Sequence, residues 1–119
     1  MSSTTTYRSG QVLVVEVPFS DGSGVKPRPA VVVSVEAFHE GLPDVIVCPI
    51  SSQPRYYVSP KNGDCPLKSW NSAGLRHAST VRVSKVLAID KEIVKRVLGR
   101  LSSDDLRHVR TAVRKAFGF

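Results

Sequence analysis

The first candidate for chemistry in the sequence is an arginine that stands between two prolines. In KPRPAVVVS, residues 26–34, Pro27 and Pro29 flank Arg28 just before a run of valines. Proline fixes its own φ and pushes the residue before it out of the helical region. The chain should therefore be extended here and present Arg28 in a preset direction. Because the planar fork of a guanidinium matches a phosphate, Arg28 is a candidate phosphate ligand.

Further polar side chains follow or interrupt other apolar segments. Ser51 and Ser52 stand just past the apolar run VIVCPI and could donate hydrogen bonds to a phosphate or sugar, or simply cap a turn. Arg82 alternates with Val81 and Val83 in TVRVSKV. That position suits either a second anion contact or a solvated strand residue.

Metal, nucleotide and hydrolase motifs do not occur in the sequence. The histidines, His39, His77 and His108, have no partner at metal-ligand spacing, and Cys48 and Cys65 are too far apart for a zinc pair. No Walker loop, G-x-S-x-G elbow or GxGxxG fingerprint appears. We therefore expect no metal site and no cofactor, with Cys48 acting as a small reduced hydrophobe in its apolar run.

Short strands must position these side chains. Apolar and alternating segments predict strands at 11–19, 30–35, 45–50, 56–60, 80–86 and 95–101. Single helical turns are expected within 36–44 and 88–94, the latter opened by Asp90, and loops at 20–27 and 61–79. Pro49 suggests that its strand lies at an edge or carries a bulge. Many short strands and one final helix imply a mainly β fold, a small and strongly bent barrel.

The C-terminal helix has the clearest pattern. Ser102 is a good N-cap with Asp105 three residues on, as in a capping box, and Leu101 and Leu106 are placed as a hydrophobic staple. Gly118 is a plausible stop. An apolar stripe at helical spacing, expected to face the core or another subunit, comprises Leu106, Val109, Val113 and Phe117.

Bulk properties fit one cytoplasmic domain over residues 1–119, with 1–7 as a disordered tail. No apolar run approaches the ~18 residues of a membrane span, and no signal peptide opens the chain. The net charge is +7, and residues 80–119 carry 10 Lys or Arg against 4 Asp or Glu. Such a basic half indicates a polyanionic partner or, alternatively, only a solvated helix face.

Six stretches resemble the MazF/PemK/Kid family of bacterial toxins, in the family's order and over about residues 8–117. They are GQVLVVEVPF, DGSG, RPAVVVS, VCPISSQ, SAGLRHASTVRVSKVLAID and GRLSSDDLRHVRTAV. The resemblance implies an SH3-like barrel of the MazF/CcdB/Kid type with a C-terminal helix, usually a homodimer. It also implies a metal-independent endoribonuclease that cuts single-stranded RNA through the neighbouring 2′-hydroxyl, leaving a cyclic phosphate and a 5′-hydroxyl. An acidic antitoxin would be its protein partner.

Carried over by position, the family's catalytic arginine falls on Arg28 and its catalytic hydroxyl residue on Ser51. Ser84 stands where Kid-like members have an aspartate two residues after an arginine, here Arg82. The base that accepts the 2′-hydroxyl proton is therefore unassigned, with His77 as a candidate. Tyr56, Tyr57 and Trp70 could stack on bases, or pack in the core. The further residues expected to contact RNA are Lys26, Ser52, Gln53, Arg55, Trp70, His77, Arg82 and Ser84.

Two other functions remain open at this point. CcdB-type toxins share the fold but poison DNA gyrase through the end of the last helix, and this chain ends in AFGF. A non-catalytic RNA-binding relative is also compatible with the serine at position 84.

Overall fold

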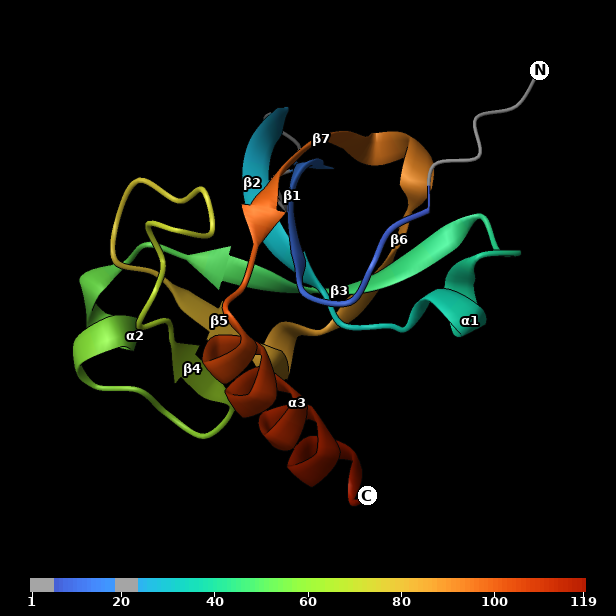
Figure 1. Cartoon of the computed structure of the whole chain (residues 1–119). Coiled ribbons are helices and arrows are strands. Elements are labelled where there is room, and N and C mark those ends of the chain that lie inside the picture. The colour runs from blue at the N-terminus through green and yellow to red at the C-terminus, as the bar shows by residue number, and fades with distance from the viewer. Residues whose placement is uncertain (1–5, 19–23) are drawn as a thin grey trace.

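A computed structural model describes residues 6–18 and 24–119. The described chain is mainly antiparallel sheet and ends in one long helix, as the sequence predicts (Figure 1). Its elements are β1 (Gln11–Pro18), β2 (Val25–Val32), α1 (Glu36–His39), β3 (Asp44–Ser51), α2 (Pro54–Val58), β4 (Asp64–Pro66), β5 (Thr80–Arg82), the 3₁₀ turn η1 (Val83–Lys85), β6 (Leu87–Asp90), the 3₁₀ turn η2 (Lys91–Ile93), β7 (Val94–Arg100) and α3 (Ser103–Phe117).

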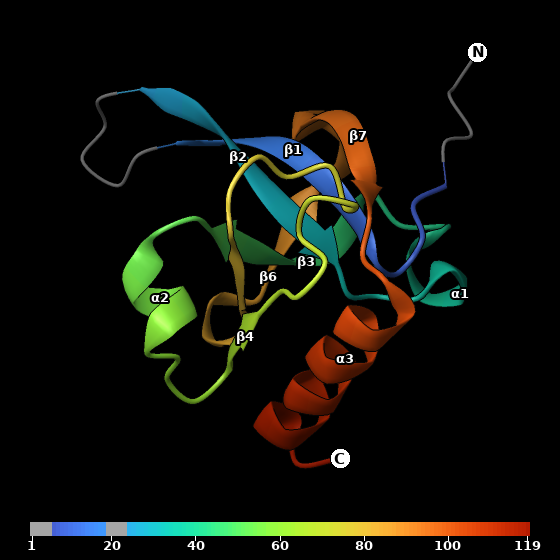
Figure 2. The ribbon, with the colours of Figure 1, turned by 60° about the vertical axis from the view of Figure 1, so that its left-hand side comes forward.

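The strands form one bent sheet in the order β4-β5-β3-β2-β1-β7, with β6 also paired to β3. β1 and β2 pair along their full length, and Figure 2 shows their far ends reaching beyond the rest of the sheet. Residues 20–23 of the loop predicted at 20–27, and the tail predicted at 1–7 as far as residue 5, lie outside the described residues. The loop prediction is wrong for Val25–Pro27, which pair with β1 as the start of β2.

Alternation explains why the first three strands read as unbroken apolar runs. Val12, Val31 and Cys48 point to a core cluster beneath α3, whereas their neighbours Leu13 and Val32 point into a second cluster enclosed by the bent sheet. Side chains alternate between the two faces of a strand. Both faces of these three strands are therefore buried along the apolar runs, whereas Val25–Arg28 at the start of β2 are exposed.

The C-terminal helix begins and ends where the sequence predicts. Ser102 Oγ accepts from the Asp105 backbone N–H at 3.1 Å, and Gly118 stops the helix at φ 78°. The second half of the predicted capping box is wrong. The Asp105 carboxylate instead accepts from the backbone N–H groups of Lys68 and Ser69, at 3.1 and 2.9 Å. It is 2% exposed, so it joins α3 to the segment after β4. Phe117 is 57% exposed in the single chain, so of the two surfaces predicted for the apolar stripe it does not face the core.

Several predicted boundaries are wrong for identifiable reasons. Residues 56–60 are not a strand: Pro54 opens helix α2, and Ser59 N–H closes a turn onto the Arg55 carbonyl. Residues 64–66 in the predicted loop form β4, which depends on pairing with β5. The turn expected within 88–94 is strand β6 followed by η2, where Asp90 does cap by accepting from Glu92 N–H.

The strand predicted at 80–86 is interrupted by η1. Val81 pairs with Ile50, and Leu87 pairs with Val47, so six residues must span three residues of β3. The surplus coils into the 3₁₀ turn. Pro49 is also not on an edge strand, since β3 pairs with β2, β5 and β6. Pro49 lies between the stretches of β3 that pair with β6 and with β5, so a missing N–H is tolerated there.

Candidate functional site

A pocket of about 350 Å³ opens where β2, β3, α2 and β5 meet. Buried apolar side chains, including Val15, Ala30 and Val47, form part of its lining. The polar side chains that line it are Arg28, Ser51, Ser52, Gln53, Tyr56, Arg82 and Lys85. An apolar surface beside three cations suits a ligand with a flat ring and an anionic group.

Arg28 is the fourth residue of β2, which begins at Val25 and not at residue 30 as the sequence predicts. It is exposed and pairs with Val15 of β1. The prolines on either side fit because β3 pairs with β2 only over Ala30–Val32 in the described part of the chain, which leaves the other edge of β2 open at Pro27 and Pro29. The arginine is thus mounted on a paired strand rather than on a loop, which reduces the entropy lost when it binds a ligand.

Ser51 is the last residue of β3 and pairs with Thr80. Its Oγ accepts a hydrogen bond from the Gln53 backbone N–H at 3.2 Å, so it caps the turn that leads into α2. The two roles that the sequence left open for Ser51, capping a turn and donating to a ligand, are compatible. Accepting this bond leaves the hydroxyl proton available for donation into the pocket.

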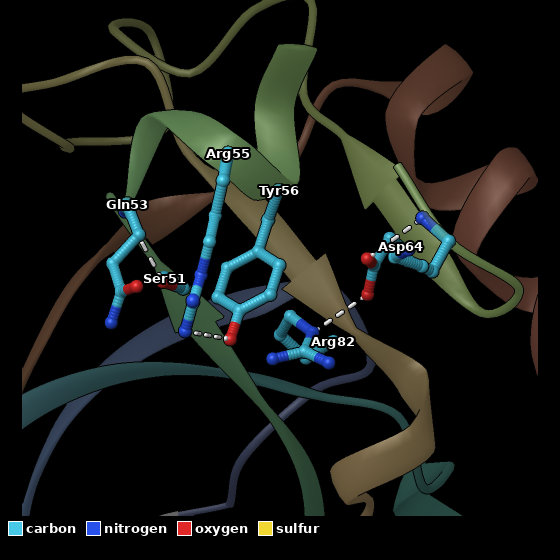
Figure 3. A network of polar contacts seen from close by, with 7 residues as sticks. Ser51, Gln53, Arg55, Tyr56, Asp64 and Arg82 are labelled. Atoms are coloured by element: carbon cyan, nitrogen blue, oxygen red, sulfur yellow. Dashed lines mark hydrogen bonds and ion pairs between the residues drawn. The ribbon is translucent and has the colours of Figure 1, made fainter. Parts of the chain in front are cut away.

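Arg82 is held from two sides in a cluster that Figure 3 shows from close by. Its Nε donates to Asp64 Oδ1 at 2.6 Å, and its guanidinium carbon lies 3.8 Å from the ring centroid of Tyr56. Arg55 donates from Nη2 to Tyr56 Oη at 2.8 Å. Asp64 also accepts from the Lys61 backbone N–H at 3.0 Å. Asp64 of β4 and Tyr56 of α2 thus fix the Arg82 guanidinium at the pocket.

These contacts change proton affinities in the pocket. Burial by itself raises the pKa of Tyr56, but the hydrogen bond from Arg55 and the charges of Arg55 and Arg82 outweigh it and lower that pKa below its usual value. Burial by itself lowers the pKa of the Arg82 guanidinium, but its hydrogen bond with Asp64 and the carboxylate charge outweigh it and raise that pKa. Arg82 stays a cation, and the Tyr56 phenolate forms more readily than that of a free tyrosine.

Half of the predicted RNA contacts gather at the pocket, and half do not. Ser52, Gln53 and Arg82 line it together with Arg28 and Ser51. Arg55 reaches it only through Tyr56. The remaining predicted contacts do not line it, and they are Lys26, Trp70, His77 and Ser84. His77, the candidate base, is exposed in an irregular segment, and Trp70 packs against the core cluster beneath α3. Tyr57 donates to the Leu67 carbonyl at 3.0 Å.

Sequence reasoning missed Asp64 and Lys85. The serine at position 84 had suggested that Arg82 lacks a carboxylate neighbour, but Asp64 of β4 supplies one with a fully buried side chain. The register that sets Asp64 opposite Arg82 comes from a three-residue strand without a sequence signature of its own. Lys85 could have been suspected from its position in the same segment as Arg82.

A buried serine–histidine pair lies elsewhere and is structural. Ser34 Oγ and His39 Nδ1 are 2.7 Å apart, and His39 Nε2 lies 2.6 Å from the Tyr7 carbonyl oxygen. The Ile46 N–H donates to Ser34 Oγ. His39 is 0% exposed and Ser34 is 8% exposed. With both ring nitrogens occupied and no access to solvent, the pair holds the segment before β1 in place.

A larger hollow, about 570 Å³, lies between α3 and the residues around β4 and η1. Ser84 lines it, together with His108 and Lys115. Arg28 and Ser51 do not, so we assign the candidate site to the smaller pocket. Within the described residues, no group of three His, Cys, Asp or Glu side chains could hold a metal ion. Both cysteines are free, and burial together with the nearby Cys65 raises the pKa of Cys48 to about 12.

Comparison with known proteins supports a single family. The family model described as "PemK-like, MazF-like toxin of type II toxin-antitoxin system" matches residues 8–117. A search of curated protein sequences gave no match. Within the described part of the chain, no helix is long and apolar enough to cross a membrane.

Solved structures with the same fold include MazF in a MazE-MazF crystal structure from Deinococcus radiodurans. It has a TM-score of 0.76 and 19% identity over 97% of this chain and 99% of that one. An endoribonuclease in complex with its cognate antitoxin from a mycobacterial species gives a TM-score of 0.75 and 19% identity, covering 95% and 96%. Mycobacterium tuberculosis toxin MazF-mt6 gives 0.69 and 20%, covering 90% and 97%.

The chain is thus a small barrel-like domain with a cationic cleft. The chain belongs to the PemK-like, MazF-like toxins of type II toxin–antitoxin systems.

Proposed function

We propose that this toxin is a metal-independent endoribonuclease that cuts single-stranded RNA at short sequence motifs. The observation that carries the proposal is that Arg28, Ser51 and Arg82, from three different strands, line one pocket. Its apolar surface would receive a base, and its cations would receive the phosphate. A mycobacterial protein with this fold is described as an endoribonuclease.

In the proposed reaction, the 2′-oxygen attacks the adjacent phosphorus and the 5′-oxygen leaves, which gives a cyclic phosphate. Arginine is protonated at neutral pH and is a poor base. Arg28 would therefore stabilise the extra negative charge on the five-coordinate phosphorus, and Ser51 would orient the phosphate by donating its hydroxyl proton. Preset donors of this kind typically lower the activation free energy by about 3–4 kcal/mol.

Binding partners follow from the same proposal. The cationic pocket would also suit an acidic antitoxin segment that folds on binding, and structures with this fold were solved as MazE-MazF complexes. We further propose a cytoplasmic homodimer, as is usual for the family. No comparison supports the gyrase alternative, although Phe117 and Phe119 are exposed and stack with their ring centroids 6.2 Å apart.

The test is cleavage of a long, weakly structured RNA in the presence of EDTA by wild type, Arg28→Ala and Arg110→Ala. Arg110 is an exposed arginine on α3 outside the pocket, so its variant controls for the loss of one charge. We expect discrete cuts by wild type and Arg110→Ala, and a loss of at least about 100-fold for Arg28→Ala. Intact RNA with folded wild type, or equal cutting by Arg28→Ala, would refute the proposal.

A further inference from the structure

Tyr56 occupies the centre of the cationic cluster at the pocket. Its ring lies between two guanidinium groups, with Arg82 at 3.8 Å and Arg55 at 4.7 Å from the ring centroid. Arg55 donates to its phenolic oxygen. Figure 3 shows Tyr56 in the same cluster as Ser51 and Arg82, and all three residues line the pocket. The hydroxyl is therefore close to where the proposed reaction would take place.

The charges that face Tyr56 favour its anion. Arg55 on α2 and Arg82 on β5 contact it directly, while Arg28 on β2 and Lys85 on η1 line the same pocket. The one carboxylate in the cluster, Asp64 on β4, is bound to Arg82. Because the phenolate has two arginine neighbours, it is stabilised relative to the neutral phenol, consistent with a lowered pKa of Tyr56.

We propose that Tyr56 is the catalytic residue that accepts the proton of the RNA 2′-hydroxyl, an assignment that rests on the proposed ribonuclease function. The phenolate oxygen takes the 2′ proton as the new bond from O2′ to phosphorus forms. The bond from phosphorus to O5′ breaks, and O5′ takes a proton from water. The resulting hydroxide takes the proton back from Tyr56. The net change is transfer of one proton from the 2′ to the 5′ oxygen.

Other candidates for this role fit the geometry less well. His77 does not line the pocket. The Asp64 carboxylate is fully buried and is occupied by Arg82 and the Lys61 N–H. Among the described side chains that line the pocket, the charged ones are the cations Arg28, Arg82 and Lys85. Tyr56 is thus the side chain in the pocket lining that can lose its own proton and then accept one from the ligand.

A purely stacking role for the tyrosine makes a different experimental prediction. Phenylalanine keeps the ring, and with it both the stacking on a base and most of the packing on Arg82, but it removes the oxygen. Tyr57→Phe is a matched control, because it deletes a neighbouring phenol that donates to the Leu67 carbonyl and does not line the pocket.

The experiment maps the cut sites of wild type on a long RNA, then measures single-turnover cleavage from pH 6 to 10. Its substrate is a short oligonucleotide with one ribonucleotide at a mapped site. For Tyr56→Phe we expect a rate about 10²–10⁴-fold below wild type. The rise of rate with pH that wild type shows below the pKa of Tyr56 should be absent. Affinity for the all-deoxy analogue should change less than about twofold, and Tyr57→Phe should keep the wild-type profile.

Three results would overturn the assignment. The first is a Tyr56→Phe variant with the wild-type rate and pH profile. The second is a rate loss matched by equal loss of affinity for the all-deoxy analogue with an unchanged profile, which would show a binding role. The third comes from a spectrophotometric titration of wild type minus Tyr56→Phe that places the pKa of Tyr56 at or above that of free tyrosine. Wild type that cuts no RNA would instead refute the proposed function itself, and this assignment with it.

Discussion

Two arginines line the proposed RNA pocket, and the protein holds them in different ways. Arg28 is fixed through its backbone, by two prolines in a paired strand. Arg82 is fixed through its side chain, by the Asp64 carboxylate and the Tyr56 ring. Asp64 offsets much of the charge of Arg82, so Arg28 and Lys85 contribute most of the pocket's net positive charge. Arg82 is therefore better suited to fixing geometry than to attracting RNA.

The role of Asp64 in fixing Arg82 can be tested by substitution. Replacing Asp64 with Ala leaves Arg82, whose side chain is 19% exposed, without its partner. Breaking a buried pair in this way costs about 3 kcal/mol, and the freed guanidinium should move. We expect a lower free energy of unfolding in urea, and slower single-turnover cleavage at a temperature where the variant is folded.

Asp104→Ala is the matched control for that experiment. The Asp104–Arg107 pair has the same 2.6 Å separation, but its side chains are 71% and 67% exposed. An exposed pair is worth at most about 1 kcal/mol, so this variant should keep both stability and cleavage. Equal effects of the two substitutions would show that burial of the Asp64 carboxylate has no role.

At the level of the elements, sequence reasoning succeeded where local pattern and tertiary structure agree. Continuous apolar runs identified β1, β3 and the second half of β2, because both faces are buried there. Ser102 and Gly118 identified the ends of α3. The same reasoning failed at β4 and α2. β4 consists of three residues that become a strand only by pairing with β5, and the tyrosines of α2 have a strand preference that Pro54 overrides.

The candidate site, like the strands and helices, could be predicted only where single residues carry a local signal. Arg28 and Ser51 carry local signals, a proline frame and the end of an apolar strand, and the structure brings them to one pocket. The contacts among Arg82, Asp64 and Tyr56 could not be predicted, because they join residues 18 and 26 positions apart in sequence through the unpredicted elements β4 and α2. Pairs of that kind leave no trace in the spacing of a single sequence.

The segment after β4 packs closely against β7 at Gly99. A Cβ added at Gly99 would lie 2.6 Å from the Ala73 carbonyl oxygen, a backbone atom with little freedom to move. Gly99→Ala should therefore lower the free energy of unfolding by about 1–3 kcal/mol, as overpacking does. Gly41→Ala, where a Cβ meets nothing within 4 Å, should change it by less than about 0.5 kcal/mol. Urea unfolding of the two variants tests this prediction. If the two variants are equally stable, the close contact between Gly99 and Ala73 has no effect on stability.

Across the whole molecule, most of the charge surplus lies away from the proposed pocket. The net charge of +7 comes mostly from residues 80–119, and within α3 the exposed arginines Arg107, Arg110 and Arg114 line a separate shallow hollow. The pocket has its own cations on β2, β5 and η1. Two groups of positive charge can thus be distinguished, one that would contact the reacting phosphate and one that would raise the concentration of RNA near the protein.

Neutralising the arginines of α3 should therefore slow the association with RNA and leave the rate of the cleavage step unchanged. The triple variant Arg107→Gln, Arg110→Gln, Arg114→Gln lowers the formal charge by three while leaving the pocket lining unchanged. We expect weaker RNA binding and lower kcat/KM at low salt, converging on wild type as salt shortens the Debye length from about 10 Å at 0.1 M to about 3 Å at 1 M. The single-turnover rate at saturating protein should stay at the wild-type value, in contrast to Arg28→Ala. A fall in that saturated rate would place α3 in contact with the reacting RNA, and the separation of the two groups of charge would then be wrong.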